Sequence, residues 1–178
     1  DNKQASDKSL PTDISGDFLQ LVTAVNPAEH YRVQHDQNNA FNWMFPGNSA
    51  FIDKNIMNGA KQVRTTGRLY TEIVLNQIKA RITLCYTKVQ SIAKARGYNQ
   101  PVDIHLAMSL AGGSGSGSFL TIAMLIDQMY HNSANLYGYG VLHGVFRSMD
   151  PMGTKTPRVI TNAYSAILDL DYLMHASD

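Results

Sequence analysis

A run of small residues between two apolar segments is the part of this sequence best suited to binding an anion. Residues 111–118 read AGGSGSGS, with four glycines and three serines. Glycine lets the backbone come within hydrogen-bonding distance of a ligand, and serine adds a hydroxyl group. A helix that begins directly after the run would add free N–H groups and the positive end of its dipole. The pattern predicts a phosphate-binding loop formed by Gly112, Gly113, Ser114, Gly115, Ser116 and Gly117.

Other interpretations of the same run compete with a phosphate site. A flexible linker is also rich in glycine and serine, but linkers lie between polar ends, whereas this run lies between MSL and FLTIAML. A tight turn with a purely structural role is a second alternative. Because no Lys-Ser/Thr pair follows the glycines, the run is not a P-loop, and its G-x-G-x-G spacing disfavours a dinucleotide-binding motif.

Upstream of the run, the apolar spacing predicts one long helix followed by a strand. From about residue 66 to residue 96, apolar residues recur at steps of three and four, which places them on one helix face. Gly97 is placed to end this helix in a left-handed conformation. Residues 102–110 (VDIHLAMSL) are apolar at odd and even positions, which predicts a strand buried on both faces. His105 would then be a hydrogen-bonded core residue.

Downstream of the run, the sequence predicts a helix, a strand and a second helix. Residues 119–130 are apolar nearly all round, which is typical of a helix in the interior. Residues 136–146 (LYGYGVLHGVF) predict the strand, and residues 159–174 predict the last helix. This alternation of helices and strands predicts an α/β fold with a mainly parallel sheet flanked by helices.

The chain divides into an N-terminal segment and a core with clear patterns. Residues 1–57 predict loops and short helices and indicate no role, whereas the predicted nucleotide-binding core spans residues 58–178. The chain starts at Asp1 and ends directly after a helical pattern. We therefore expect an incomplete domain, a fragment of a longer protein.

Composition excludes several classes of function. The chain has 178 residues, of which 44% are hydrophobic and 16% charged, with a formal net charge of +1. This is the composition of a globular domain, and its charge gives no steering toward nucleic acid. No apolar run approaches the roughly 20 residues that span a bilayer, and no signal peptide opens the chain.

Residues that hold metals or perform acid–base chemistry show no suitable spacing. The lone Cys85 excludes an internal disulfide and a cysteine-based zinc site, and it predicts a reducing, cytoplasmic location. The six histidines have no metal-ligand spacing. Neither a carboxylate pair nor a serine–histidine arrangement is evident. We therefore assign no metal ligand and no catalytic residue.

Three segments resemble the tubulin and FtsZ superfamily. Residues 111–117 (AGGSGSG) resemble its signature loop, [G/A]-G-G-[S/T]-G-[S/T]-G, which also lies between a strand and a helix. Residues 59–69 (GAKQVRTTGRL) are similar to the segment with the γ-phosphate-sensing loop, in a form with R-x-x-G-R that resembles divergent bacterial tubulin-like proteins. Residues 161–168 (TNAYSAIL) resemble the helix whose asparagine contacts the guanine base. The family's first phosphate loop and its acidic loop for hydrolysis have no counterpart here.

The resemblance implies a Rossmann-like GTPase domain that binds GTP or GDP with Mg²⁺. The amides of residues 113–117 would contact the α- and β-phosphates. Gly59, Ala60 and Arg64 would face the γ-phosphate, and Asn162 would contact the base. Arg64 and Arg68 share a helix face and would neutralise phosphate charge, unless they are solvated or paired with carboxylates. A helix cap or a helix-surface residue is the alternative for Asn162.

The leading hypothesis is a guanine-nucleotide-binding domain, a GTPase that self-assembles into filaments. The alternative is a non-catalytic scaffold module of the same fold within a larger assembly. A different Rossmann-like enzyme that uses NAD or ATP is a more remote third hypothesis. The expected partners are a guanine nucleotide and further copies of the chain or other subunits of an assembly.

Overall fold

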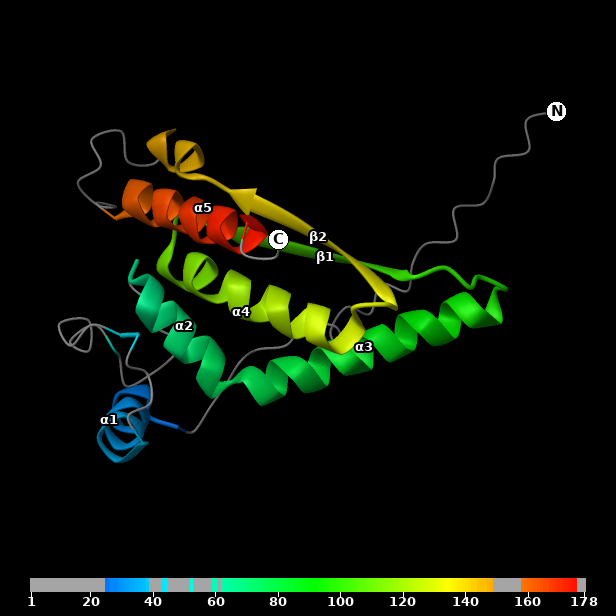
Figure 1. The fold of residues 1–178 in the computed structure, drawn as a ribbon, viewed down its shortest axis with the longest axis horizontal. Helices are drawn as coiled ribbons and strands as arrows, with labels where there is room; N and C mark the ends of the chain where they lie inside the picture. The colour runs from blue at the N-terminus through cyan, green and yellow to red at the C-terminus, as the bar shows by residue number, and fades with distance from the viewer. Residues whose placement is uncertain are drawn as a thin grey trace.

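A computed structural model describes residues 25–38, 43–44, 52, 59–60, 62–148 and 158–175. Helices and strands alternate along the chain from β1 onward, which confirms the α/β fold class (Figure 1). The elements are α1 Pro27–Asn38, α2 Arg64–Ile73, α3 Leu75–Ala95, β1 Val102–Ser109, α4 Gly113–Tyr130, β2 Ala134–Val141, the 3₁₀-helix η3 His143–Ser148 and α5 Val159–His175.

The two strands form a parallel pair. Their register runs from Val102 opposite Ala134 to Ser109 opposite Val141, and α4 connects them. The expected parallel sheet is therefore confirmed. The second strand, however, ends at Val141 and not near residue 146, because the chain turns into η3 at His143.

Strand β1 has one partly covered face and one exposed face, whereas β2 is exposed along nearly its whole length within the described residues. Along β1, alternate residues including Asp103 and His105 are exposed, so the prediction of a strand buried on both faces is wrong. This period of two is that of a strand with one covered face. His105 is hydrogen-bonded as predicted, at 3.0 Å from the Tyr139 hydroxyl, but it lies on the exposed face, where its ring stacks on Tyr137.

The predicted long helix consists of two helices. Val74 separates α2 from α3 with non-helical angles (φ −103°, ψ 11°), and its side chain is buried with Ile78 and Leu125. The periodicity did not reveal this break because the apolar spacing continues through it. Gly97 has φ +79° directly after α3, as predicted.

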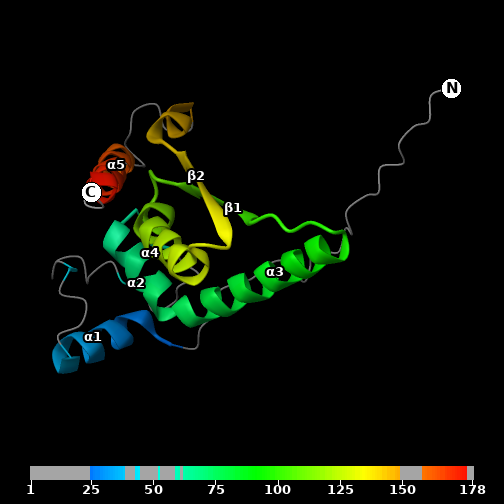
Figure 2. The same ribbon diagram turned by 45° about the vertical axis from the view of Figure 1, so that its right-hand side comes forward.

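Helix α4 lies at the centre of the described structure, between α2 and the sheet (Figures 1 and 2). Leu125 packs against α3, and Phe119 packs against Leu110 and Ala166. The prediction of an interior helix is only partly right, because Met124 is 60% exposed.

Helix α1 lies in the segment for which the sequence predicts only loops and short helices. The Asn26 side-chain oxygen accepts hydrogen bonds from the backbone N–H groups of Ala28 (3.1 Å) and Glu29 (3.4 Å). Pro27 occupies the first helical position, where its missing N–H costs nothing. Tyr31 packs against Leu69 and Tyr70, which attaches α1 to α2.

Candidate functional site

The junction between β1 and α4 is the candidate anion site. Leu110 and Ala111 follow β1, and α4 begins at Gly113 with Gly112 as its extended N-cap residue (φ −82°, ψ 175°). No side chain caps this helix end. The first four N–H groups, those of residues 112–115, therefore have no acceptor within the helix. The carboxyl ends of both parallel strands lie at this edge, where α/β folds bind ligands.

Most of the glycine run is helical, which corrects the predicted loop and excludes a flexible linker. The N–H groups of Ser116 and Gly117 lie beyond the first turn and donate within the helix. The buried Ser116 hydroxyl donates to the Gly112 carbonyl. The Ser118 hydroxyl lies 3.3 Å from the Gly115 carbonyl as donor, whereas the Ser114 side chain is exposed.

The glycines of the run allow close backbone packing. A Cβ atom at Gly113 would lie 2.6 Å from the Val63 nitrogen, and one at Gly117 would lie 2.8 Å from the Arg68 nitrogen. A Cβ at Gly67 in α2 would lie 2.9 Å from the Ser114 Cα. Such distances are too short for non-bonded atoms. Helices α2 and α4 can therefore approach this closely only because these positions are glycine.

The turn that contains Gly59 and Ala60 lies beside the start of α4. Ala60 is buried, and its carbonyl accepts a hydrogen bond from the Val63 N–H at 2.8 Å. Gln62 has a positive φ of 60° and packs with Val63 against Gly113. Gly59 has φ +71° and nothing near its Cβ position. The structure thus brings the predicted γ-phosphate segment to the predicted phosphate site.

Asn162 joins these segments to α5. Its side-chain nitrogen donates to the Gln62 carbonyl at 3.0 Å and to the Ala111 carbonyl at 3.1 Å, and the residue is 6% exposed. The three segments that the sequence singled out therefore meet at one buried amide. Both N–H donors of Asn162 are engaged in these contacts, which gives the residue a structural role, and the base contact stays a prediction. Its burial also contradicts the alternative of a helix-surface residue.

Arg64 connects α2, α4 and α5. Its Nε and one terminal nitrogen each lie 3.2 Å from the Ser116 carbonyl, and the same terminal nitrogen lies 2.5 Å from an Asp169 oxygen. Arg68 lies on the same face of α2, as predicted, and pairs with Glu72 at 2.9 Å. Both arginines therefore pair with carboxylates, which was the alternative to phosphate binding.

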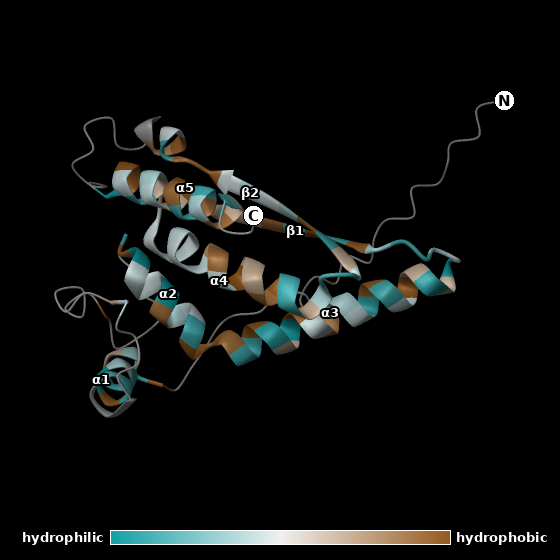
Figure 3. Ribbon diagram, in the orientation of Figure 1, coloured by the Kyte–Doolittle hydropathy of each residue, from teal (hydrophilic) through white to brown (hydrophobic). Residues whose placement is uncertain are grey.

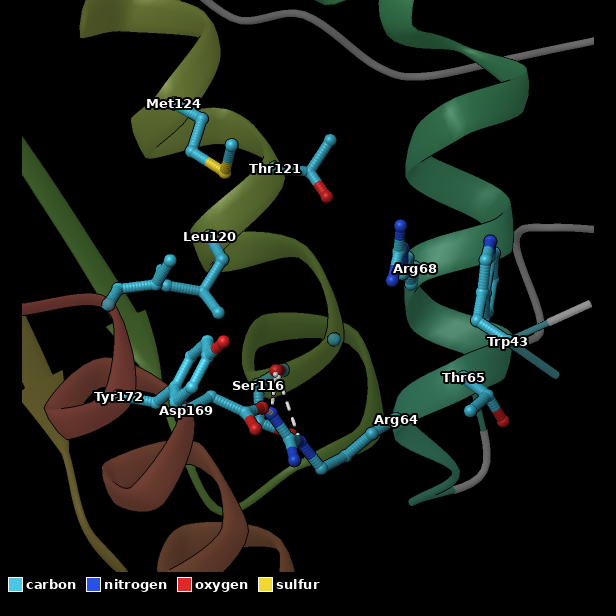
Figure 4. Close-up of a pocket in the computed structure, with 12 residues that line it drawn as sticks. Trp43, Arg64, Thr65, Arg68, Ser116, Leu120, Thr121, Met124, Asp169 and Tyr172 are labelled. Atoms are coloured by element: carbon cyan, nitrogen blue, oxygen red, sulfur yellow. Dashed lines mark hydrogen bonds and ion pairs between the residues drawn. The ribbon is translucent and has the colours of Figure 1, made fainter. Parts of the chain in front are cut away.

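A groove of about 400 Å³ runs along α4 between α2 and α5. In Figure 4, Arg64 reaches from α2 toward Asp169 on α5, and Trp43 lies beside Arg68. The Arg68 guanidinium carbon is 4.2 Å from the centre of the Trp43 ring, a cation–π contact. Of the predicted site residues, Arg64, Ser116 and Gly117 line this groove, which therefore flanks α4 and does not lie at its N-terminus.

Asp169→Asn is expected to lower the free energy of unfolding by about 1 kcal/mol, because the Asp169 side chain is 48% exposed and solvent screens part of its attraction to Arg64. Urea denaturation measures the loss. The matched control is Asp127→Asn, whose partner His131 lies 2.9 Å away on the exposed end of α4. We expect the control to change stability less, and equal losses in the two variants would contradict a bridging role for Asp169.

The comparison with protein families identifies the fold. A family model described as tubulin-like matches residues 14–178. The chain belongs to the tubulin-like family. Searches of curated proteins and of solved structures found no match to the chain. The tubulin-like match also includes part of residues 1–57, for which the sequence indicated no role.

Metal-ligand clusters and membrane-spanning helices are both absent from the described part of this tubulin-like chain. Among the residues described, no group of three or more His, Cys, Asp or Glu side chains is arranged to hold a metal ion. In the same part of the chain, no helix is long and apolar enough to cross a membrane.

Sequence reasoning missed the contributions of Gln62 and Asp169. Gln62 supplies a carbonyl to Asn162 from a backbone with positive φ, and Asp169 pairs with Arg64 across 105 positions. No local pattern marks either contact. Gly67 does carry a signal, because a glycine inside a helical pattern often marks close backbone approach.

Proposed function

We propose that this tubulin-like domain binds a guanine nucleotide and places its phosphates at the N-terminus of α4. The observation that carries the proposal is the β1–α4 junction, where one strand of a parallel pair leads into an 18-residue helix with an uncapped N-terminus. Membership of the tubulin-like family supports guanine over other bases. Mg²⁺ would be bound chiefly through the phosphate oxygens.

The environment of each residue in the run indicates which ones would contact phosphate. A Cβ at Gly112 would meet nothing closer than the Ser109 hydroxyl at 3.9 Å, so there is room at this position for a ligand. Ser114 is exposed and offers both an N–H and a hydroxyl. Gly59 has open space around it and lies in the adjoining turn. These three residues are the proposed direct contacts.

The remaining predicted residues would shape the site. Gly113 and Gly117 pack against the backbone of segment 62–68, and Ser116 hydrogen-bonds within α4. Arg64 donates a hydrogen bond to the Ser116 carbonyl, just after the first turn of α4. We propose that Arg64 positions α4 and that Asn162 fixes the turn at Gln62. Both would affect nucleotide binding indirectly.

Nucleotide binding is tested with fluorescent GTP and GDP analogues in the presence of Mg²⁺. We expect saturable binding that unlabelled GTP and GDP displace and that NAD and ATP displace much less. Displacement by NAD or ATP in preference to GTP would favour a different nucleotide-binding function. If no analogue binds at millimolar concentration, the nucleotide proposal is wrong.

The second part of the proposal is that the chain self-associates when the nucleotide is bound. This part rests on membership of the family and not on a contact seen in the structure. Light scattering with GTP and with GDP tests it. Growth of scattering with GTP alone is expected. Binding without a difference in scattering would instead support the alternative, a static module within a larger assembly.

Ser114→Asp is expected to weaken nucleotide binding by about tenfold or more, because its carboxylate would repel a phosphate at the same helix end. Stability should be unchanged or slightly higher, since a carboxylate at a helix N-terminus interacts favourably with the dipole. The analogue titration and a thermal melt measure the two effects. Thr87→Asp adds the same charge at an exposed position of α3 and should leave affinity unchanged. Unchanged affinity in Ser114→Asp would place the phosphates elsewhere.

A further inference from the structure

Gln62 lies between the start of α4 and the start of α5. A Cβ atom at Gly113 would lie 2.9 Å from the Gln62 Cα, so the backbone of Gln62 is in direct contact with the first residue of α4. The start of α5 packs on the same junction, because Val159 and Ala163 are buried together with Ala111. Figure 3 shows the brown, apolar start of α5 close to the pale start of α4, which is rich in glycine and serine.

Two hydrogen bonds connect Gln62 to α5. The side-chain oxygen Oε1 of Gln62 accepts from the Arg158 N–H at 3.4 Å, directly before the helix begins. The backbone carbonyl of Gln62 accepts from Asn162 Nδ2 at 3.0 Å, in the first turn of the helix. The pair of Arg64 with Asp169 is a separate link, seven residues farther along α5. Segment 62–64 therefore holds α5 at two places that are about two turns apart.

The backbone conformation of Gln62 indicates that these contacts fix its position. Its φ of 60° is in the left-handed region, which residues other than glycine, asparagine and aspartate rarely adopt. Gln62 is the third residue of the turn that the Val63 N–H closes by donating to the Ala60 carbonyl, and a positive φ at this position favours glycine. A residue keeps such a conformation only where its surroundings hold it there.

We propose that Gln62 is a positioning residue that couples the phosphate site to α5, so that a bound nucleotide stabilises the first turn of α5. This inference rests on the proposed function, in which Gly59 is a direct phosphate contact. A ligand that holds residues 59–62 in place also holds the two oxygen atoms that accept hydrogen bonds from α5. Coupling between sites is reciprocal, so loss of the contact with α5 should weaken nucleotide binding in turn.

Amide hydrogen exchange of the full chain without nucleotide tests the link between Gln62 and α5. Gln62→Met keeps the length of the side chain and removes its acceptor oxygen, and the Arg158 and Asn162 amides should exchange about fivefold faster, the effect of one hydrogen bond. Gln62→Glu keeps an acceptor and should not accelerate exchange. Gln77→Met, at an exposed position of α3, is the matched control and should leave both rates unchanged. Unchanged rates in Gln62→Met would overturn the proposal.

Exchange with and without a GTP analogue and Mg²⁺ tests the coupling itself. In the wild type, nucleotide should slow exchange of the same two amides by about fivefold. Saturated Gln62→Met should show little of this change and bind the analogue more weakly than Gln77→Met does. Asp169→Asn removes the other link to α5 and should keep the change.

Two outcomes would overturn the coupling. One is binding of the analogue without slower exchange at these amides, and the other is an equal loss of the change in Asp169→Asn. Both differ from failure of the proposed function, which is seen as absence of binding in the analogue titration and would contradict the coupling as well. The rates without nucleotide would then still show whether Gln62 holds the start of α5.

Discussion

Gly117→Ala is expected to lower the free energy of unfolding by about 3 kcal/mol, the upper range for overpacking a well-packed interior. The added methyl group would lie 2.8 Å from the Arg68 nitrogen and also press on the Arg64 carbonyl. Both obstacles are backbone atoms of α2, which cannot rotate away as a side chain can. Helix α2 would have to move from α4 and lose part of the contact between them. Urea denaturation of the purified variant measures the loss.

Gly138→Ala is the control for this prediction. Gly138 lies in β2, and a Cβ there would have nothing within 4 Å, so its substitution should change stability by less than about 1 kcal/mol. The comparison also separates two roles for the glycine run. If Gly117→Ala were as stable as the control but bound nucleotide poorly, the glycine would serve the ligand and the packing explanation would be wrong.

Asn162→Asp is expected to cost about 3 kcal/mol at neutral pH. The side-chain nitrogen of Asn162 donates to the carbonyls of Gln62 and Ala111, and a carboxylate has no N–H to replace it. The buried Ala111 carbonyl and the partly buried Gln62 carbonyl would lose their donor and would face a negative charge, and each unsatisfied buried group costs about 1–3 kcal/mol. Thermal and urea unfolding measure the loss. Asn132→Asp, at an exposed position after α4, should stay within about 0.5 kcal/mol of the wild type.

The pH dependence of Asn162→Asp gives a second readout. Burial and the two carbonyls would raise the pKa of the introduced carboxyl group above its usual range in the folded state. A raised folded-state pKa means that stability is retained at low pH and lost as the pH rises through that pKa. The variant should therefore be closest to the wild type in acid, where its O–H can donate to one carbonyl. Wild-type stability at every pH, with loss of nucleotide affinity alone, would instead support a base contact.

Gly117 and Asn162 both contribute to the packing around the start of α4. Gly117 lets α2 approach α4 closely, and Asn162 connects α5 to the carbonyls of Gln62 and Ala111 beside the start of α4. The N–H groups proposed to bind phosphate lie within the same turn of helix. A rigid helix end is a better anion site than a flexible loop, because its donors need no further ordering when a ligand arrives.

Local patterns in the sequence predicted much of this protein. Periodicity identified the α/β alternation and the strand 102–110 to within one residue of β1, and Gly97 marked the end of α3. The glycine run predicted a strand-to-helix junction. Its residue types also matched the signature loop of the family, and the comparison confirmed that resemblance. These features depend on neighbouring residues, whose spacing and backbone preferences are visible in the chain itself.

Only the tertiary structure decided how the run is used. Three features depend on segments that are far apart in the chain: the start of α4 at Gly113, the pairing of Arg64 with Asp169 and the inward orientation of Asn162. Glycine is suited both to a loop around a phosphate and to a helix pressed against another helix, so its presence does not distinguish them. The close approach of α2 determines which conformation forms, since packing against a neighbour outweighs the weak local preference of glycine and serine.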